Sequence, residues 1–301
     1  MHRRSFLQGS GLVLGSSLLF QKNLLAEMLQ QPAFKIQMLR ENLGIFTERG
    51  GTIGFLLTNE GIVVVDSQFP EQSQRLIDEL KKKSDKPFRL LINTHHHGDH
   101  TAGNISFKGV TQHVLAHSNS KSNQEKVAQQ QKTEDKQLYP DQVFGDVWSE
   151  KIGKEKITLH YFGAGHTNGD SLIHFEHNDV VHMGDLMFNR RYPFIDRGAG
   201  ANIKSWISIL EKADKKFSKK TVFIFGHAHE TASVTGGKED LKLMKDFFEK
   251  LLAFTESEVK AGRTKEDFLK STAIPGVTEW KGDGIQRPLG SAWDEVTAKA
   301  G

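Results

Sequence analysis

Residues 94–100 read Thr94-His95-His96-His97-Gly98-Asp99-His100, and this stretch decides the interpretation of the chain. It follows an apolar run, Phe88 to Asn93, which predicts a buried strand. His95 and His97 are two residues apart, so an extended backbone points both imidazoles to the same side, toward one metal ion. The pattern His-x-His-x-Asp-His arises by chance on the order of once in a thousand sequences of this composition. The stretch therefore predicts a metal-binding loop.

Further candidate ligands complete this loop. Asp99 and His100 follow the two histidines and can turn toward a second metal ion. Three more candidates each come after an apolar, strand-like run and stand beside a glycine: His166, Asp185 and His227. In α/β architectures the ends of strands collect reactive groups, and glycine lets the backbone approach a crowded site closely. The sequence thus predicts one site built from several strand ends.

The composition narrows the class of protein. Of the 301 residues, 26% are charged and 37% are hydrophobic, as in soluble globular enzymes. No cysteine is present, which excludes thiolate ligands and leaves His, Asp and Glu to hold a metal. The formal charge is +3, but Arg3, Arg4 and Lys22 lie within the first 26 residues, where no acidic residue occurs. The rest of the chain is neutral, so no nucleic-acid partner is expected.

The N-terminus resembles a twin-arginine export signal. Arg3-Arg4 precedes an apolar run from Phe6 to Phe20, whose 15 residues fall short of the roughly 20 that a membrane span needs. We expect residues 1–26 to be a signal peptide that engages the export machinery, with no stable membrane span and a periplasmic destination. A retained anchor is the alternative, because Leu24-Leu25-Ala26 matches a cleavage site only loosely.

Residues 27–301 are expected to form one α/β domain with C-terminal helices. Apolar runs separated by glycine-containing turns predict strands at Phe34 to Leu39, Gly44 to Glu48, Gly54 to Thr58, Ile62 to Asp66, Phe88 to Asn93, Val114-Leu115, Ile157 to Phe162, Leu172 to Phe175, Val180 to Met183 and Val222 to Phe225. Predicted helices are Gln72 to Lys83, the polar segment Asn119 to Gln137, and two amphipathic segments, Ile203 to Phe217 and Leu241 to Leu252.

The candidate ligands resemble the motifs of the metallo-β-lactamase superfamily, in that family's order: Thr94 to His100, Gly165-His166-Thr167, Met183-Gly184-Asp185 and Gly226-His227. The resemblance implies an α/β (α+β) fold, a four-layer αββα sandwich of two mixed β-sheets with the metals at one edge. It also implies ligand sets, namely His95, His97 and His166 for one metal ion and Asp99, His100 and His227 for the other, with Asp185 bridging. Asp66, after Val63-Val64-Val65, matches an early structural aspartate of the family.

Asp185 sets the expected chemistry. The commonest subclass of these β-lactamases has a cysteine at this position, so the chain looks more like glyoxalase II and related hydrolases. We expect a metal-dependent hydrolase in which a hydroxide held by two metal ions cleaves an ester, thioester, lactone or amide of a small molecule. Asp99 is the candidate for orienting that hydroxide. Two divalent ions are expected as cofactors, zinc first, with iron or manganese as alternatives because the second ligand set is rich in carboxylate.

Other functions stay open. Within the fold, a β-lactamase is the next alternative, followed by a mononuclear iron redox enzyme such as a sulfur dioxygenase. A nuclease ranks low because the chain after residue 26 is neutral. An exported metal-binding protein without turnover is the alternative outside enzymes. Asp99, His100 and Asp185 argue against it, since a structural site would close its coordination sphere.

The segment after Asp185 mixes cations with aromatic rings and supplies the candidate substrate-binding residues Arg190, Arg191 and Tyr192. Either arginine is suited to receive a carboxylate, and a solvated arginine pair is the alternative.

Three more polar residues lie near the ligands in sequence. His96 should point away from the metals by strand alternation and is interpreted as structural. Asp170 is expected either to accept a hydrogen bond from a ligand histidine or to be a turn carboxylate. His229 is interpreted as a surface-loop histidine, and lining of the groove is the alternative.

Overall fold

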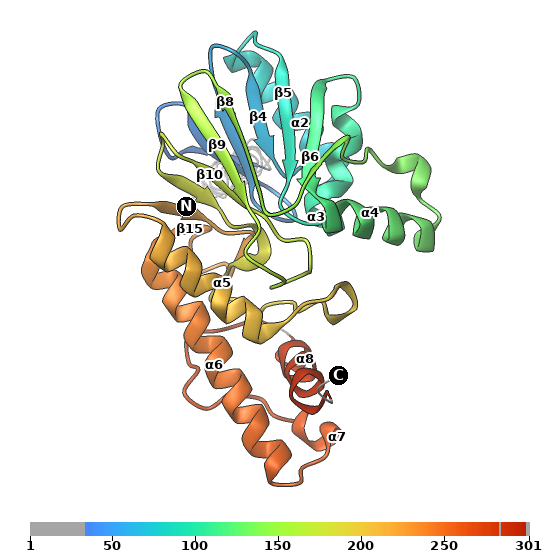
Figure 1. Ribbon diagram of the computed structural model, residues 1–301, viewed down its shortest axis with the longest axis vertical. Helices are drawn as coiled ribbons and strands as arrows, with labels where there is room; N and C mark the ends of the chain where they lie inside the picture. Colours follow the sequence, from blue (N-terminus) through green and yellow to red (C-terminus); the bar gives the residue numbers. More distant parts are fainter. Residues whose placement is uncertain (1–33, 283, 299–301) are drawn as a thin grey trace, which may run out of the picture. The chain divides into compact units, whose positions relative to one another are not determined.

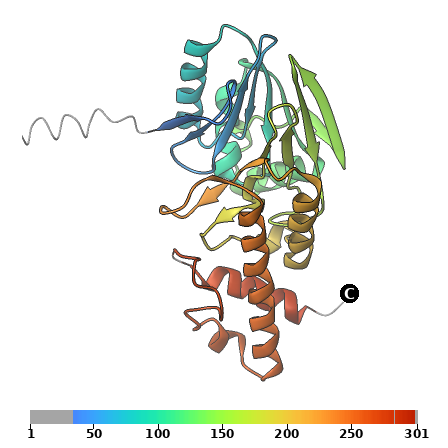
Figure 2. The ribbon, with the colours of Figure 1, turned by 90° about the vertical axis from the view of Figure 1, so that its left-hand side faces the viewer.

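The computed structural model describes residues 34–282 and 284–298. The predicted signal peptide, residues 1–26, lies outside them. From residue 36 onward, two mixed β-sheets pack face to face and helices cover their outer sides (Figures 1 and 2). This arrangement confirms the predicted αββα sandwich.

The first sheet has seven strands in sequence order and carries the His-rich loop. Its β2, β3 and β4 are antiparallel neighbours, whereas β4, β5, β6 and β7 run parallel. The strands are β1 (Lys35–Met38), β2 (Leu43–Thr47), β3 (Ile53–Leu57), β4 (Ile62–Val65), β5 (Phe88–Asn93), β6 (Thr111–His117) and β7 (Gln142–Phe144). All four β4 residues are buried, as expected for a strand covered on both faces.

The second sheet has six strands in the order β15-β13-β11-β10-β9-β8. Only β11 and β13 are parallel; the other pairs are antiparallel. The strands are β8 (Val147–Ile152), β9 (Glu155–His160), β10 (Leu172–Phe175), β11 (Val180–His182), β13 (Val222–Ile224) and β15 (Thr235–Gly236). A separate parallel pair, β12 (Phe188–Asn189) and β14 (His227–Ala228), lies beside the metal-ligand candidates.

Two hydrophobic cores hold the layers together. The core between the sheets takes alternate residues of facing strands, such as Val63 and Val65 from β4 and Leu159 from β9. The other core joins the far face of the second sheet to the helices, with Trp206 fully buried. Burial of such apolar surface is the main force that stabilises the sandwich.

The helices cover both outer faces. α2 (Pro70–Lys83), α3 (Gly98–Thr101) and α4 (Ser118–Gln131) flank the first sheet, and α5 (Ile203–Lys216) packs on the second. α6 (Lys238–Lys260) includes the predicted amphipathic segment and buries its apolar residues, Leu241, Met244, Phe247, Phe248, Leu251 and Leu252. α5 buries Ile203, Trp206, Ile209, Leu210 and Ala213. No helix in the described part of the chain is long and apolar enough to cross a bilayer.

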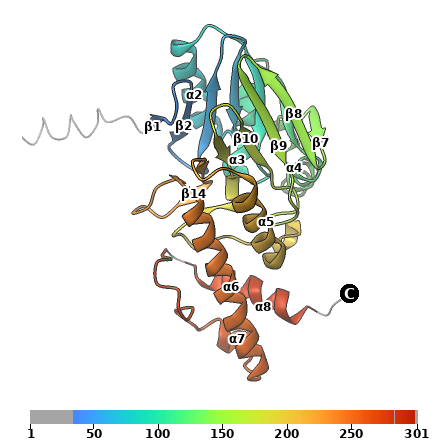
Figure 3. The same cartoon turned by 60° about the vertical axis from the view of Figure 1, so that its left-hand side comes forward.

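The C-terminal region adds α7 (Lys265–Phe268) and α8 (Gln286–Thr297), and Figure 3 shows α8 crossing α6. Glu295 of α8 attaches this region to α5. Its Oε2 accepts hydrogen bonds from the Arg197 guanidinium (2.9 Å) and the Ile203 amide (2.8 Å), and its Oε1 accepts from the Lys204 amide (3.0 Å). A carboxylate at the first amides of a helix pairs donors that otherwise have no intrahelical partner.

The sequence-based boundaries were wrong in several places. α4 ends at Gln131 instead of Gln137, because Lys132 adopts a left-handed conformation (φ 55°) that terminates the helix. The edge strand β8 was not predicted, since its alternate residues are solvent-exposed and its sequence is mostly polar. The bounds of α8 were not predicted from the sequence either.

The Glu295 contacts lead to a stability prediction. Glu295→Ala should lower the free energy of unfolding by about 2 kcal/mol, since hydrogen bonds to a charged acceptor contribute about 1.5–3 kcal/mol. We expect a fall in Tm of roughly 4–8 °C by thermal denaturation. Asp294→Ala is the matched control, because the Asp294 carboxylate is half exposed and pairs with an exposed lysine, Lys265. Equal Tm values for the two variants would contradict this role of Glu295.

Candidate metal centre

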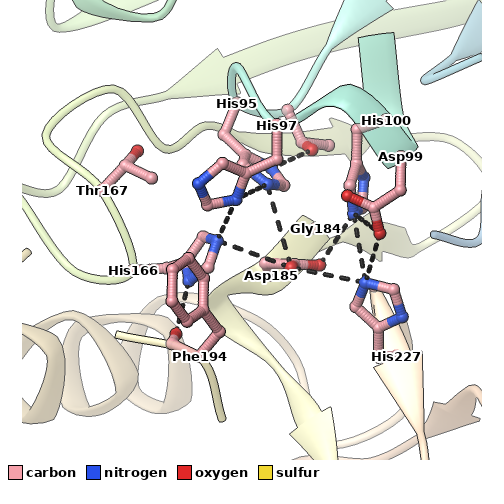
Figure 4. Close-up of polar contacts among 12 residues, drawn as sticks. His95, His97, Asp99, His100, His166, Thr167, Gly184, Asp185, Phe194 and His227 are labelled. Carbon is pink, nitrogen blue, oxygen red and sulfur yellow. Dashed lines mark hydrogen bonds and ion pairs between the residues drawn. The ribbon is translucent and has the colours of Figure 1, made fainter. Parts of the chain in front are cut away.

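All seven predicted ligands meet at one edge of the sandwich (Figure 4). His95 and His97 lie on the turn after β5, and Asp99 and His100 belong to α3, which begins where that turn ends. The other three come from the second half of the chain, on the loop after β9, on the turn after β11 and on β14: His166, Asp185 and His227.

One cluster combines three imidazoles and a carboxylate. His97 Nδ1 lies 3.1 Å from His95 Nε2 and 2.9 Å from His166 Nε2. Asp185 Oδ2 lies 3.8 Å from His95 Nε2 and 3.5 Å from His166 Nε2. The four donor atoms all lie within 4.8 Å of one another, which is the spacing of ligands around a single ion.

The second cluster lies directly beside the first. His227 Nε2 is 3.1 Å from Asp99 Oδ2 and 3.4 Å from His100 Nε2. Asp185 also faces this cluster, with Oδ1 3.0 Å from His100 Nε2 and Oδ2 3.4 Å from His227 Nε2. A single buried carboxylate thus contacts both groups of ligands.

Hydrogen bonds at the outer ring nitrogens show which nitrogen of each imidazole carries the proton. The Phe194 carbonyl and the Asp196 carboxylate can only accept, so His166 donates from Nδ1 (2.8 Å) and His97 donates from Nε2 (2.9 Å). Thr94 Oγ1 donates to a carboxylate and therefore accepts from His95 Nδ1 (3.0 Å). The remaining nitrogen of each neutral ring presents a lone pair to the centre of the cluster.

Asp66 holds the ring of His100. Its Oδ2 lies 2.8 Å from His100 Nδ1 and accepts the ring proton, while the Thr94 amide and hydroxyl donate to the two carboxylate oxygens at 2.7 Å each. Asp66 is fully buried and has a left-handed backbone (φ 65°) at the end of β4. The early aspartate noted in the sequence therefore orients the His-rich loop.

These contacts fit a cation. Lone pairs that face one another at about 3 Å repel, and a positive ion between them removes the repulsion. Although Asp185 Oδ1 lies 3.0 Å from His100 Nε2, this buried oxygen accepts no hydrogen bond of normal geometry, as expected of an oxygen that a metal ion would coordinate. Nitrogen and carboxylate ligands in these numbers suit zinc, and the absence of thiolate leaves iron and manganese possible.

The charge distribution differs between the clusters. Burial lowers the pKa of His166 to about 3, so this ring stays neutral. Burial also lowers the pKa of His227, but Asp185 and Asp99 outweigh it and raise that pKa to about 9. Burial opposes ionisation of Asp185, yet His227 and His100 keep its pKa well below the usual range. The carboxylates are therefore ionised, as metal ligands must be.

Glycines allow this crowding. A Cβ at Gly226 would lie 2.0 Å from Asp185 Oδ1, and one at Gly51 would lie 2.1 Å from a His100 ring carbon. The close approach predicted for the glycine before His227 is confirmed. The role of the Gly50-Gly51 turn could not be anticipated, because it depends on contacts with a distant loop.

The sequence model of the metallo-beta-lactamase superfamily matches residues 46–229, more than half of the chain. The chain belongs to the metallo-β-lactamase superfamily. All seven candidate ligands lie within the matched residues, whereas α6, α7 and α8 lie beyond them.

Named relatives agree with this membership. A type 2 metallo-β-lactamase of Elizabethkingia meningoseptica is 25% identical over 207 residues, which cover 66% of this chain and 80% of the relative. The crystal structure of metallo-β-lactamase IND-7 matches with a TM-score of 0.60 and 24% identity, covering 73% of this chain and all of that one. A metallo-β-lactamase from Pontibacter korlensis matches with a TM-score of 0.61 and 18% identity, covering 72% of this chain and 99% of that one. More than a quarter of this superfamily member therefore has no counterpart in these two solved structures.

The structure separates the three candidate substrate residues. Arg190 bonds with Asp240 (2.6 Å) and lies 3.4 Å from Glu279. Tyr192 packs against the core beside Phe247. Only the exposed Arg191 lines a pocket near the metal-ligand candidates. The three candidate residues are thus adjacent in sequence but have different surroundings in the fold.

The other predicted polar residues also have defined places. His96 is buried outside both ligand clusters, with Nε2 3.8 Å from Asp196 Oδ2. Asp170 does not contact a ligand imidazole. It accepts hydrogen bonds from the amides of Gly165 and Thr167 and from the Thr167 hydroxyl, and so shapes the loop of His166. Of the two interpretations offered for Asp170, the turn carboxylate is confirmed.

Asp196 was not identified from the sequence. Asp196 lies 99 residues after His97, and no sequence motif surrounds it. Only the folded structure brings the two side chains together. The His97 hydrogen bond, against the effect of burial, lowers the pKa of Asp196 to about 2. The loop from residue 190 to 196 thus holds His97 through Asp196 and His166 through the Phe194 carbonyl.

Removal of this support should weaken metal binding. Asp196→Ala is expected to lower zinc affinity about 10–100-fold, because the free ring nitrogen no longer fixes the orientation of His97. Competition with a chromophoric chelator measures the change. Asp141→Ala is the control, since Asp141 accepts from an exposed histidine, His113, outside both clusters. A variant at Asp196 that competes as well as wild type would show that this carboxylate does not support the site.

Proposed function

We propose that this protein is a metal-dependent hydrolase that cleaves an ester, thioester, lactone or amide bond of a small molecule. The observation that carries the proposal is the pair of adjoining ligand clusters that share the Asp185 carboxylate. Membership of the metallo-β-lactamase superfamily supports it. We propose as ligands His95, His97, Asp99, His100, His166, Asp185 and His227.

The clusters are buried on one side and open on the other. His95, His100 and His166 are at most 1% exposed, whereas the side chains of His97, His227 and Asp99 are 19%, 13% and 33% exposed. A substrate can therefore reach the centre from the side of these three residues. When bound here, two divalent ions lower the pKa of water toward about 7 and polarise a carbonyl oxygen.

The protein's own groups have separate tasks in this proposal. Asp99 is the most exposed ligand candidate, and its carboxylate is placed to accept a hydrogen bond from the attacking water and orient it. A hydrogen bond from Gly51 N to the Asp99 carbonyl (3.1 Å) fixes the backbone of this residue. The ring of Phe194, 43% exposed and 5.5 Å from that of His97, forms an apolar wall that suits the hydrocarbon part of a substrate.

β-Lactam hydrolysis is the second candidate. The relatives in the comparisons carry the name metallo-β-lactamase, which favours it. The carboxylate at position 185 and the additional C-terminal helices favour a different acyl substrate. Residues 1–26 support an additional proposal, that the protein acts after export to the periplasm.

Turnover should depend on the solvent-exposed ligand candidates. Asp99→Ala is expected to lower kcat/KM by at least about 100-fold, the size of effect that loss of a positioned proton acceptor causes. His97→Ala should have a similar effect, because it removes a proposed metal ligand. The fold should persist, because both side chains lie at the surface of the cluster. His113→Ala is the control histidine, exposed and remote from the ligands. Variants that fold, bind metal and retain full activity would disprove the mechanism.

A substrate panel distinguishes the two candidate functions. The zinc-loaded protein should hydrolyse thioesters or activated esters with kcat/KM at least about tenfold above that for a chromogenic cephalosporin, a difference of about 1.4 kcal/mol in transition-state stabilisation. The reverse ranking would establish the β-lactamase instead. Metal analysis of the same preparation should give two ions per chain; a single iron per chain would favour the redox alternative.

A further inference from the structure

A fully buried histidine lies close to the metal centre but belongs to neither ligand cluster. His182 is the last residue of β11 and precedes the turn that carries Asp185. Its Nε2 donates to the Thr52 carbonyl (3.0 Å), and its Nδ1 accepts from the Gly184 amide (3.1 Å). A carbonyl only accepts and an amide N–H only donates, so these contacts fix one neutral tautomer. Burial lowers the pKa of His182, which agrees with a neutral ring.

The backbone joins the two partners of His182 to each other. The Thr52 amide donates to the Gly226 carbonyl (2.9 Å), and the Gly226 amide donates to the Gly184 carbonyl (2.8 Å). Together with the two bonds of the imidazole, these contacts close the His182 cycle, four hydrogen bonds through His182, Thr52, Gly226 and Gly184. His182 contributes its side chain, whereas the other three members contribute backbone groups. A substitution can therefore open the cycle most directly at His182.

Two backbone members of the cycle directly precede ligand candidates. Gly184 comes before Asp185, and Gly226 comes before His227. The Gly226 backbone is packed so closely on the Asp185 carboxylate that a Cβ at this position would overlap Oδ1. The hydrogen bond between the two glycines therefore constrains the separation of the Asp185 carboxylate and the His227 imidazole, which Figure 4 shows facing each other.

The third backbone member connects the cycle to the His-rich loop. Thr52 follows Gly51, whose amide donates to the Asp99 carbonyl (3.1 Å). A Cβ at Gly51 would overlap the ring of His100, so this backbone is in direct contact with the imidazole. A displacement of Thr52 would thus move the surface against which Asp99 and His100 are packed.

The imidazoles of the first cluster have other supports. Their outer ring nitrogens bond with groups outside the cycle, namely Thr94 Oγ1, the Asp196 carboxylate and the Phe194 carbonyl. The backbone members of the cycle, in contrast, adjoin all the ligand candidates of the second cluster. The two clusters are therefore held by different sets of hydrogen bonds.

We propose that His182 is a positioning residue for the second metal ion. Through the cycle it holds three segments, those of Gly51, Asp185 and His227, at the spacing that ligands of one ion need. A rigid ring that accepts on one side and donates on the other is suited to this task. The proposal rests on the proposed ligand set and deepens it, because it assigns the affinity of the two clusters to separate supports.

Metal binding provides the first test. Zinc is titrated into metal-free protein against a chromophoric chelator, which resolves the two ions. His182→Phe keeps a ring but removes both hydrogen bonds. It should weaken one ion about tenfold or more, as loss of an outer support does, and leave the other within about twofold of wild type.

Two backgrounds identify the weakened ion. His97→Ala removes a proposed ligand of the first cluster, and His227→Ala removes one of the second. In the His97→Ala background the remaining ion should still be weakened about tenfold by His182→Phe, whereas in the His227→Ala background it should change less than about twofold. The opposite pattern, or equal weakening of both ions in the otherwise wild-type chain, would overturn the proposal.

Conservative variants separate positioning from a general loss of stability. His182→Gln can donate to the Thr52 carbonyl and should recover zinc affinity to within about threefold of wild type, because the bond between the two sheets is restored. His182→Asn can accept from the Gly184 amide but is too short to reach Thr52, and should bind as weakly as His182→Phe. His160→Phe is the matched control, since this buried histidine of β9 stacks on Phe162 outside the cycle. Affinity that follows Tm across the four variants would contradict a positioning role.

Turnover separates this proposal from the proposed function. With zinc in excess, His182→Phe should lower kcat about tenfold and leave KM within about twofold, because Asp99 and Asp185 are displaced while the exposed side of the site is unchanged. A raised KM with unchanged kcat would overturn the role of His182. A wild type that binds two ions but hydrolyses no member of the substrate panel would disprove the hydrolase, and the zinc titrations would still decide the role of His182.

Discussion

The buried carboxylate of Asp66 fixes the geometry on which the metal centre depends. It joins the end of β4 to the turn after β5 through Thr94, and it holds the ring of His100 through the nitrogen that faces away from the cluster. These contacts fix the orientation of both rings, so that Nε2 of His95 and Nε2 of His100 face Asp185. The sandwich supplies the rigidity for this arrangement, because β4 is buried on both faces and cannot move without disturbing both layers.

The sequence was sufficient for the general architecture and for the set of residues that meet at the centre. The strand Phe88–Asn93 was predicted with its observed bounds, since a mostly apolar, buried run before a turn has few alternatives. The end of α4 was missed because a lysine, with no glycine signal, adopts the left-handed conformation. Asp196 and the contrast between Arg190 and Arg191 were also missed. They depend on which distant segment packs beside each residue, and this information is absent from local sequence.

The C-terminal helices lie beyond the residues that match the superfamily model. They share the hydrophobic core of α5 and are attached by the Glu295 carboxylate, so they form an integral layer of the fold. The segment between α7 and α8 runs alongside Arg191, because Lys281 exchanges backbone hydrogen bonds with Arg190 and Tyr192. The edge that carries the metal-ligand candidates is therefore combined here with a helical layer beyond the superfamily match.

The loop from residue 190 to 196 has a further consequence. One end carries Arg191 at the pocket, and the other supplies the Phe194 carbonyl and the Asp196 carboxylate that hold two ligand imidazoles. A compound that shifts this loop would alter the affinity of these imidazoles for a metal ion, and thermodynamic reciprocity would require the ion to alter the compound's affinity by the same factor. Occupancy of the pocket and metal binding would then be linked equilibria.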